Sequence, residues 1–316
     1  MDIEEMKKIH GPIVRLAYDI NIVNLEAKKN PKKLIATAEK FYHDQINSIV
    51  KKVVEKQIKI IKIAGPSASG KTTTAKLIAS TLKKVGIGSV VISLDDFFLP
   101  REKTPKLPNG NYDFENITAI DQKLYTKFMK SLINNCFANK PIFDFIAGKS
   151  LKTELIKINN QDVIIIEGIH ALNPIFEKGL NAKKYNIYIS CEANYVWGRE
   201  LLIPARILRL MRRCLRDFYK RGTSIDETLK AWPNVCRGES DYIKPFKYTA
   251  NFLLDSTHVY EPLLYDVYLK PLLIHSNKEN KYIQDFNYIF SKTGKMTKDY
   301  IPANSLIWEI LVKNDN

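Results

Sequence analysis

Cysteine is scarce in this sequence, and long apolar runs are missing. The 316 residues include four cysteines, which lie far apart and form no C-x-x-C pair. This usage argues against a structural zinc site and indicates a reducing, cytoplasmic environment. No apolar run reaches the roughly 20 residues of a membrane span. The acidic segment Met1–Glu5 lacks the apolar core of a signal peptide, so we expect neither secretion nor a membrane partner.

Acidic residues are also in the minority. The sequence has 34 acidic and 49 basic residues, a formal net charge of +15. A nucleic-acid partner or a polyphosphate substrate would each explain the excess. Most lysines are spread singly along the chain, however, which favours a plain composition bias. The length and the 45% hydrophobic content fit one large domain with extensions, or two domains.

Residues 65–72 form the most informative segment, because they read G-x-x-x-x-G-K-T, the phosphate-binding loop of P-loop proteins. The two glycines allow backbone N–H groups to turn toward phosphates, and Lys71 adds a positive charge. The Thr72 hydroxyl is suited to Mg²⁺. An apolar strand at 58–63 and a helix after the loop supply the context that the motif requires. The predicted nucleotide-binding residues are Gly65, Pro66, Ser67, Ala68, Ser69, Gly70, Lys71, Thr72 and Thr73.

Acidic residues follow two other predicted strands. Strands are expected at 58–63, 89–94, 163–166, 185–190 and 251–256. Asp95 and Asp96 follow the second of these strands, at the edge where α/β sheets bind ligands. One of them can accept the proton of an attacking hydroxyl, although both could instead be turn residues. Glu167 ends the third strand, where it can hold Mg²⁺ opposite Thr72.

Arginines cluster between Arg199 and Arg221. Arg206, Arg209, Arg213 and Arg216 are spaced by three and four residues, which places them on one helical face, with Arg212 beside it. Guanidinium groups crowded in this way are suited to phosphate oxygens. We therefore predict a lid helix that closes over the transferring phosphoryl group. A solvated basic face and a nucleic-acid patch are the alternatives.

A substrate region is expected between the second and third strands. Asp113 could hydrogen-bond a polyol such as a ribose. Residues 141–146 and 151–158 are predicted to form a hairpin around Gly148. We assign Asp95, Asp113, Phe143, Gly148, Glu167 and His170 to substrate binding.

Taken together, these segments resemble the uridine kinase and phosphoribulokinase family of P-loop kinases. The matching segments are GPSASGKTT at 65–73, SLDDFF at 93–98, YDFENITAID at 112–121, FDF at 143–145, IIIEGIHALNP at 164–174 and RLMRRCLRDFYKRG at 209–222. The segments at 232–251 and 301–311 are similar to the branch whose longer members carry a TGS domain. The resemblance covers about 31–311, where 31–57 is similar to the last connecting segment of those longer proteins.

The resemblance implies a role for each matching residue. Asp95 matches the general base, while Thr72 and Glu167 match the Mg²⁺ positions. Asp113 matches the aspartate that binds sugar hydroxyls. Four arginines match the lid, namely Arg209, Arg212, Arg213 and Arg216. The implied cofactors are ATP and Mg²⁺.

The hairpin departs from the family pattern. Kinases of this family that read a pyrimidine have a tyrosine at the position of Phe143 and a histidine at that of Gly148. Without the hydrogen bonds of these two side chains, a site discriminates poorly between bases. The aspartate that usually precedes the lid arginines is Ile207.

The sequence therefore predicts an α/β protein with a P-loop kinase fold. We expect a five-stranded parallel sheet with helices on both faces, a substrate hairpin and an arginine lid. The expected domains are an N-terminal helical extension at 1–57, a kinase core at 58–258 with its lid at about 199–222, and a C-terminal helical extension at 259–316 packed on the core.

The predicted reaction is ATP-dependent phosphorylation of a nucleoside to its 5′-monophosphate, and the alternative is phosphorylation of another small alcohol or sugar. A nucleotide-dependent, RNA-associated regulator is the third hypothesis, and it is less favoured because a regulator does not need the base, the Mg²⁺ position and the lid together. A homo-oligomer is compatible with the sequence.

Overall fold

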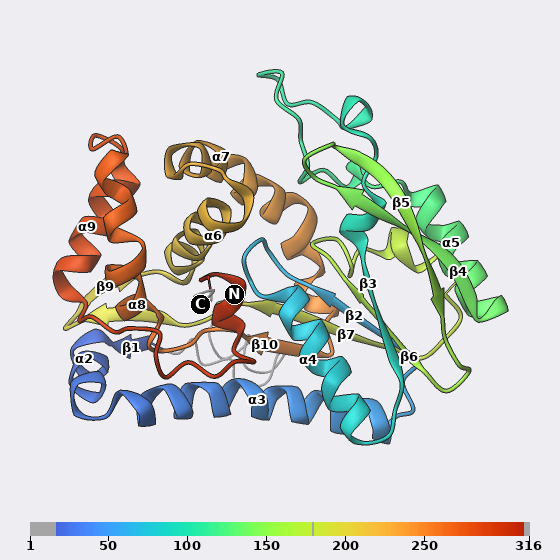
Figure 1. The fold of residues 1–316 in the computed structure, drawn as a ribbon, viewed down its shortest axis with the longest axis horizontal. Coiled ribbons are helices and arrows are strands. Elements are labelled where there is room, and N and C mark those ends of the chain that lie inside the picture. Colours follow the sequence, from blue (N-terminus) through green and yellow to red (C-terminus); the bar gives the residue numbers. More distant parts are fainter. Residues whose placement is uncertain (1–16, 179, 313–316) are drawn as a thin grey trace. The chain divides into compact units, whose positions relative to one another are not determined.

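The computed structural model describes residues 17–178 and 180–312 (Figure 1). Contacts between residues divide the chain into two compact units. Unit 1 comprises Met1–Asp44, Ser190–Pro233 and Asp255–Asn316, and unit 2 comprises Gln45–Ile189 and Asn234–Leu254. The acidic Met1–Glu5 segment lies outside the described residues. The predicted boundaries between core and extensions, at 57 and 258, stay predictions.

Unit 2 is built on a five-stranded parallel sheet. Its strands, in the order β10-β7-β2-β6-β3, are β2 (Ile60–Ala64), β3 (Ser89–Ser93), β6 (Val163–Glu167), β7 (Lys184–Ser190) and β10 (Phe252–Asp255). In the register of the central strands, Ile61 lies beside Ile165 on β6 and Tyr185 on β7. The parallel sheet predicted from the sequence is confirmed.

The central strands are buried on both faces because their side chains are almost continuously apolar. Every residue of β2 and β6 is buried. Helix α5 (Gln122–Asn135) shares a core with Ile60, Ile92 and Ile164. Helix α4 (Lys71–Lys84) contacts β2, β3 and β6. Burying each such isoleucine contributes about 1.5–3 kcal/mol, so these contacts fix the strand ends that carry the acidic residues.

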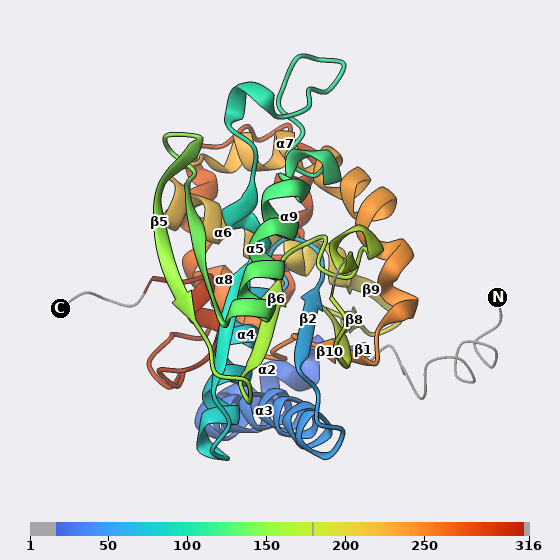
Figure 2. The same cartoon turned by 90° about the vertical axis from the view of Figure 1, so that its right-hand side faces the viewer.

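The predicted hairpin is also present in unit 2. Strands β4 (Phe137–Asp144) and β5 (Lys149–Lys157) form an antiparallel pair in which Asn139 lies opposite Leu155 and Pro141 opposite Thr153. The first strand begins four residues earlier than the predicted Pro141. Helix α5 packs against β4 (Figure 2).

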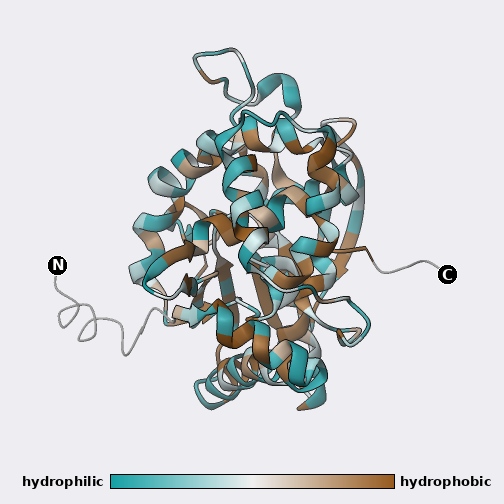
Figure 3. Ribbon diagram, turned by 90° about the vertical axis from the view of Figure 1, so that its left-hand side faces the viewer, coloured by the Kyte–Doolittle hydropathy of each residue, from teal (hydrophilic) through white to brown (hydrophobic). Residues whose placement is uncertain are grey.

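The N-terminal part is helical, as predicted. Helix α2 (Ile20–Lys29) is followed by α3 (Pro31–Glu55), and both lie within the helical extension expected at 1–57. Pro31 begins α3, where its missing N–H costs no hydrogen bond. Hydrophobic and hydrophilic residues alternate along these helices (Figure 3). One set of apolar residues, which includes Ile35 and Tyr42, is buried, whereas others such as Ile22 and Leu25 are exposed.

Unit 1 also contains a small sheet that the sequence analysis missed. Strand β8 (Asn194–Trp197) pairs in parallel with β1 (Ala17–Asp19) and antiparallel with β9 (Glu200–Ile203). Strands of three or four residues are too short to show an alternating pattern. The basic helix α6 (Ala205–Arg221) therefore begins at Ala205, after Pro204, and not at Arg199.

The remaining helices are α7 (Ile225–Gly238), α8 (Glu261–Tyr268) and α9 (Lys281–Lys292). The last two lie within the segment 259–316, where a helical extension was expected. None of the described helices combines the length and the apolar content that a membrane span needs.

Candidate active site

The phosphate-binding loop joins β2 to the first turn of α4. Gly70 has a φ of 90°, a left-handed conformation that favours glycine. A Cβ at Gly65 would lie 1.9 Å from the carbonyl oxygen of Ile189, so only glycine allows this approach. The Thr74 hydroxyl donates a 2.7 Å hydrogen bond to the Gly70 carbonyl oxygen. These constraints direct the loop into the N-terminus of α4, the usual site for phosphate.

Lys71 and Thr72 occupy the first turn of α4. Lys71 Nζ donates a hydrogen bond of 3.1 Å to the carbonyl oxygen of Pro66, so its ammonium group lies back over the loop. Thr72 Oγ1 donates to Glu167 Oε1 at 3.1 Å. The structure thus brings together the two residues predicted to bind Mg²⁺, although 95 positions separate them in sequence.

Glu167 lies in an unusual electrostatic environment. Burial of its side chain, and after it the nearby charge of Asp95, raise the pKa of its carboxyl group to about 7. The charge of Lys71 and hydrogen bonds from Ser93 and Thr72 oppose this rise. Two carboxyl groups close together beside a single lysine are typical of a site that receives a cation or a proton.

Asp95 and Asp96 are adjacent in sequence but have different surroundings. Both lie in the short 3₁₀ helix Leu94–Phe97, directly after β3. The Asp95 backbone N–H donates to the Ser93 hydroxyl at 3.3 Å, and its charge acts on Glu167. Asp96 accepts a 2.6 Å hydrogen bond from Lys140 Nζ on β4. Of the two, Asp95 is therefore the one beside the phosphate-binding loop.

Asp113 is held by residues that the sequence analysis missed. It is buried, and its Oδ2 accepts a 2.7 Å hydrogen bond from Arg237 Nη2 near the end of α7. Arg237 also donates to Asn234 Oδ1 and to Asp241 Oδ2, at 2.9 and 3.2 Å. The segment WPNVCRGE was noted only as part of a resemblance, since an arginine 124 residues from its partner gives no local pattern. The pairing fixes the orientation of the Asp113 carboxylate.

His170 lies three residues after Glu167 and is buried. Burial lowers the pKa of its imidazole to about 4, despite opposing contributions from the backbone groups of Glu115 and Tyr242. Its ring meets the Tyr242 ring edge-on at 6.0 Å. Among the described residues, no side chain forms a hydrogen bond with either ring nitrogen. A neutral imidazole of this kind can donate to or accept from a small polar ligand.

The hairpin presents aromatic groups where a base-reading kinase has polar ones. Phe143 is buried, and its ring centroid lies 5.7 Å from that of Phe98 and 5.2 Å from that of Phe145. Gly148 has a φ of 68°, and a Cβ there would lie 2.8 Å from Arg101 Nε. Arg101 closes the turn by donating to the Phe145 carbonyl oxygen at 2.7 Å. A histidine at position 148 would collide with Arg101, which explains the glycine.

The lid arginines belong to unit 1, and Arg212 differs from the others. Its side chain is fully buried. It donates through Nε to Glu261 Oε2 at 2.7 Å and through Nη2 to the Ser256 carbonyl oxygen at 2.6 Å, and it also forms an ion pair with Glu261 Oε1. These bonds give Arg212 a structural role within unit 1. Its predicted role at the phosphoryl group is untested.

Of the other lid arginines, Arg209 is also buried, whereas Arg213 and Arg216 are partly buried. Arg209 lies with its guanidinium carbon 5.5 Å from the ring centroid of Trp232. Arg213 and Arg216 both approach Asp217, at 3.2 and 2.8 Å. One carboxylate therefore lies among several guanidinium groups, and the face remains net positive. Such a face suits a ligand with several negative charges.

A metal ion at Thr72 and Glu167 would find hydroxyl and carboxylate oxygens, the donors that Mg²⁺ prefers. Within 17–178 and 180–312, no three His, Cys, Asp or Glu side chains are grouped so that they could hold a metal ion. Magnesium commonly uses one or two protein oxygens together with substrate phosphates, so the donor set fits Mg²⁺ bound with a nucleotide better than a metal held by protein alone.

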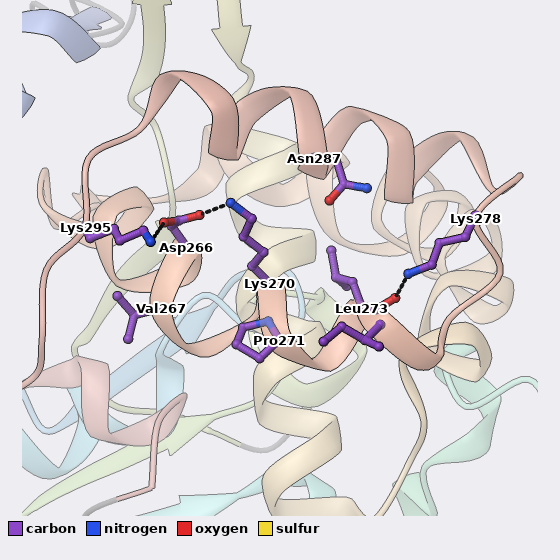
Figure 4. Close-up of a pocket in the computed structure, with 9 residues that line it drawn as sticks. Asp266, Val267, Lys270, Pro271, Leu273, Lys278, Asn287 and Lys295 are labelled. Atoms are coloured by element: carbon purple, nitrogen blue, oxygen red, sulfur yellow. Dashed lines mark hydrogen bonds and ion pairs between the residues drawn. The ribbon is translucent and has the colours of Figure 1, made fainter.

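A pocket also opens within unit 1, lined by residues of α8, α9 and the segments around them (Figure 4). Three lysines line it with Asp266, which accepts a 2.9 Å hydrogen bond from Lys270 Nζ. None of the predicted site residues lines this pocket. Because its lysines are exposed, we assign no ligand to it.

Comparison with known proteins agrees with this geometry. Residues 60–260 match the phosphoribulokinase/uridine kinase family. The chain is 31% identical over 197 residues to a uridine kinase of Mycoplasma genitalium, covering 62% of this chain and 84% of that protein. It is 29% identical over 229 residues to a uridine kinase of Borrelia duttonii, covering 70% of this chain and 98% of that protein.

A possible uridine kinase from Bacillus stearothermophilus aligns with a TM-score of 0.46 and 19% identity, covering 67% of this chain and 98% of the other. A D-glycerate 3-kinase from Cryptococcus neoformans aligns with a TM-score of 0.45 and 14% identity, covering 67% of this chain and 89% of the other.

The match to the family spans well over half of the chain, and it includes the phosphate-binding loop and the strand ends that carry the acidic residues. The chain therefore belongs to the phosphoribulokinase/uridine kinase family, and it is an ATP-dependent phosphotransferase.

Proposed function

We propose that this protein transfers the γ-phosphoryl group of ATP to a hydroxyl group of a nucleoside, giving the 5′-monophosphate. The main support is the convergence of Thr72, Glu167 and Asp95 beside the phosphate-binding loop, with a 3.1 Å bond between the first two. Each residue comes from a different element, and each has a distinct part in phosphoryl transfer.

Residues of unit 2 have separate roles in this phosphoryl transfer. The loop amides and Lys71 hold the ATP phosphates in place. Thr72 and Glu167 would hold Mg²⁺, which supplies neutralising charge when it is bound. Asp95 accepts the proton of the acceptor hydroxyl as that oxygen attacks. Glu167 and Asp95 thus keep separate roles although their charges interact.

Asp113 orients the acceptor by accepting hydrogen bonds from its other hydroxyl groups. An ionised carboxylate only accepts hydrogen bonds, and each hydroxyl of a diol can donate one. A carboxylate therefore suits a diol better than a side chain that must also donate. The 2.7 Å bond from Arg237 holds this carboxylate in one orientation. We propose Arg237 as the residue that positions Asp113, and Asn234 as its support.

In the same reading, Arg209, Arg213 and Arg216 stabilise the negative charge on the transferring phosphoryl group. Arg212 holds α6 in place through Glu261 and Ser256. This assignment separates arginines that act on the substrate from one that acts on the lid itself.

A second acceptor class is another small alcohol or sugar. The observation that favours it is the hairpin, where Phe143 packs on Phe98 and Phe145 and Gly148 packs on Arg101. The side chains of Phe143 and Gly148 offer no hydrogen bonds to the edge of a base. If a nucleoside is the acceptor, the enzyme should discriminate weakly between bases.

An acceptor panel tests both readings. Purified protein with ATP and Mg²⁺ is assayed for ADP release with uridine, cytidine, adenosine, ribose, glycerate and pantothenate. Faster release with several nucleosides supports the first reading, and faster release with a non-nucleoside alcohol supports the second. Failure of every acceptor, together with RNA binding that weakens steeply with salt, would favour the RNA-associated regulator.

A further inference from the structure

Lys140 is an unusual residue for its place in the hairpin. It lies in the middle of β4, where its side chain retains only 13% of its accessible surface. Lysine is rarely buried to this extent unless its ammonium group has a partner. In the hairpin register Lys140 lies opposite Glu154 on β5, but a second carboxylate, from outside the hairpin, lies closer.

That carboxylate belongs to Asp96. Lys140 Nζ donates a 2.6 Å hydrogen bond to Asp96 Oδ2, whereas Glu154 Oε2 lies 3.6 Å away. The Asp96 side chain retains 18% of its accessible surface, and that of Glu154 retains 55%. Opposite charges attract each other more strongly where water is largely excluded, so Asp96 is the stronger partner. The ion pair connects β4 with the short 3₁₀ helix Leu94–Phe97.

The same 3₁₀ helix carries Asp95, and the ion pair constrains its orientation. A 3₁₀ helix has about three residues per turn, so neighbouring side chains point about 120° apart. Because Lys140 holds Asp96 against the hairpin, Asp95 points in another direction, and its charge acts on Glu167. The buried ring of Phe97 packs against aromatic rings of α5 and anchors the next position. Asp96 and Phe97 together fix the turn from which Asp95 projects.

The ion pair also distinguishes two adjacent carboxylates. Without a cation, Asp96 would place a second negative charge next to Asp95, and like charges in one site favour uptake of a proton by one of the two groups. The bond from Lys140 neutralises the charge of Asp96 within the fold. The lysine therefore separates the roles of two aspartates that the sequence presents as equivalent.

We propose that Lys140 is a positioning residue for phosphoryl transfer, which acts through Asp96 to orient Asp95 toward the acceptor hydroxyl. This inference rests on the proposed role of Asp95 as the base. It also connects the base with the substrate hairpin, because the lysine that holds the turn belongs to β4.

Turnover of Lys140 variants tests this role. ADP release is measured with ATP, Mg²⁺ and uridine, and hydrolysis of ATP by water is measured without uridine, since Asp95 would be the base for either oxygen. Lys140→Met removes the cation and keeps a long side chain. It should lower kcat by about 10- to 100-fold, the effect of displacing a reacting group by about 1 Å, and leave the KM for ATP within about threefold of the wild-type value. Lys140→Arg keeps the charge and should recover most of the loss.

A double-variant cycle tests whether Lys140 acts through Asp96. Asp96→Ala removes the same bond and should lower kcat to a similar extent. Because both changes remove one interaction, the double variant should be slower than the slower single variant by no more than about threefold. Glu154→Gln is the matched control, since it removes the other carboxylate near Lys140 and leaves the bond to Asp96 in place. Its kcat should match that of the wild type.

The role of Lys140 is overturned if Lys140→Met keeps the wild-type kcat, or if the losses of the two single variants multiply in the double variant. A KM for ATP that rises as much as kcat falls would also overturn it, because the nucleotide site itself would then be damaged. Asp96→Ala gives the same test if Lys140→Met does not fold.

Asp95→Asn separates this inference from the proposed function. If Asp95→Asn turns over normally, or if the wild type transfers phosphoryl groups to neither uridine nor water, the proposed function fails and the role of Lys140 fails with it. If Asp95→Asn is inactive while Lys140→Met is fully active, only the role of Lys140 fails.

Discussion

Replacing Arg212 with methionine separates the structural role of this arginine from its predicted catalytic role. The guanidinium donates to Glu261 at 2.7 Å and to Ser256 at 2.6 and 3.0 Å, and both charged side chains are fully buried. Methionine fills similar space but leaves the Glu261 carboxylate without its cation. We expect a large loss of stability that does not depend on ATP.

The size of the loss follows from burial. Removing one member of a buried ion pair costs about 3–5 kcal/mol, because the remaining charge cannot return to water. Glu261 would still accept from the Tyr265 hydroxyl at 2.5 Å and the His258 backbone N–H at 2.7 Å, which places the expected loss toward the lower end of that range. Adding Glu261→Gln removes the stranded charge and keeps one acceptor oxygen. The double variant should therefore lose less than the sum of the two single variants.

Urea unfolding followed by circular dichroism measures these free energies. Arg206→Met is the matched control, since Arg206 is exposed on the same helix and its loss should change stability by no more than about 0.5 kcal/mol. The reasoning is refuted if Arg212→Met unfolds within about 1 kcal/mol of the wild type and yet abolishes turnover. The guanidinium would then act at the phosphoryl group.

Three further predictions concern the site and its surroundings. Asp95→Asn should lower kcat by about 10²–10⁴-fold and leave ATP affinity, measured by calorimetry, nearly intact; near-normal turnover would remove Asp95 as the base. Arg237→Gln should raise the acceptor KM by about tenfold with little change in kcat. Arg237→Lys should recover part of this loss, and the control Asp241→Asn should leave KM unchanged. An equal fall in kcat would point to a different role for Arg237. Burial opposes ionisation of Glu261, but its arginine partner and hydrogen bonds hold its pKa below the usual value for glutamate. The stability that Glu261 contributes is therefore complete above that usual value and declines as the pH falls through the lowered pKa. The unfolding free energy of Glu261→Gln, measured against pH, should lose part of this acid slope.

Most of the fold could be predicted because its signals are local. The β-branched run at 58–63 and the glycine loop after it predict a buried strand, a turn and a helix within 25 residues, and the structure has β2 and α4 there. Strand β8 gave no such signal. Its four residues pair with Ala17–Asp19, more than 170 positions earlier, and pairing at that distance leaves no mark in either segment.

Some residues of the candidate site could be predicted from the sequence, and others could not. Residue type and position after a strand pointed to Glu167 and Asp95, because strand ends meet at one edge of a parallel sheet. Arg237 escaped notice, since it is one arginine near the end of a helix whose partner, Asp113, lies 124 positions earlier. Helical spacing placed Arg212 only beside the arginine face, and the family resemblance added it to the lid, but neither says which side chain is buried.

The sequence by itself determined the chemistry: a loop that can bind phosphate, strands that end in carboxylates and a helix rich in guanidinium groups. These follow from residue types at short spacings, where backbone geometry leaves few alternatives. Tertiary structure alone decided which charged side chains bind partners within the protein and which remain for a ligand. Arg212 lies beside Glu261, Arg237 beside Asp113 and Arg101 beside Gly148, because contacts between distant segments set burial, and burial sets the energy of a charge.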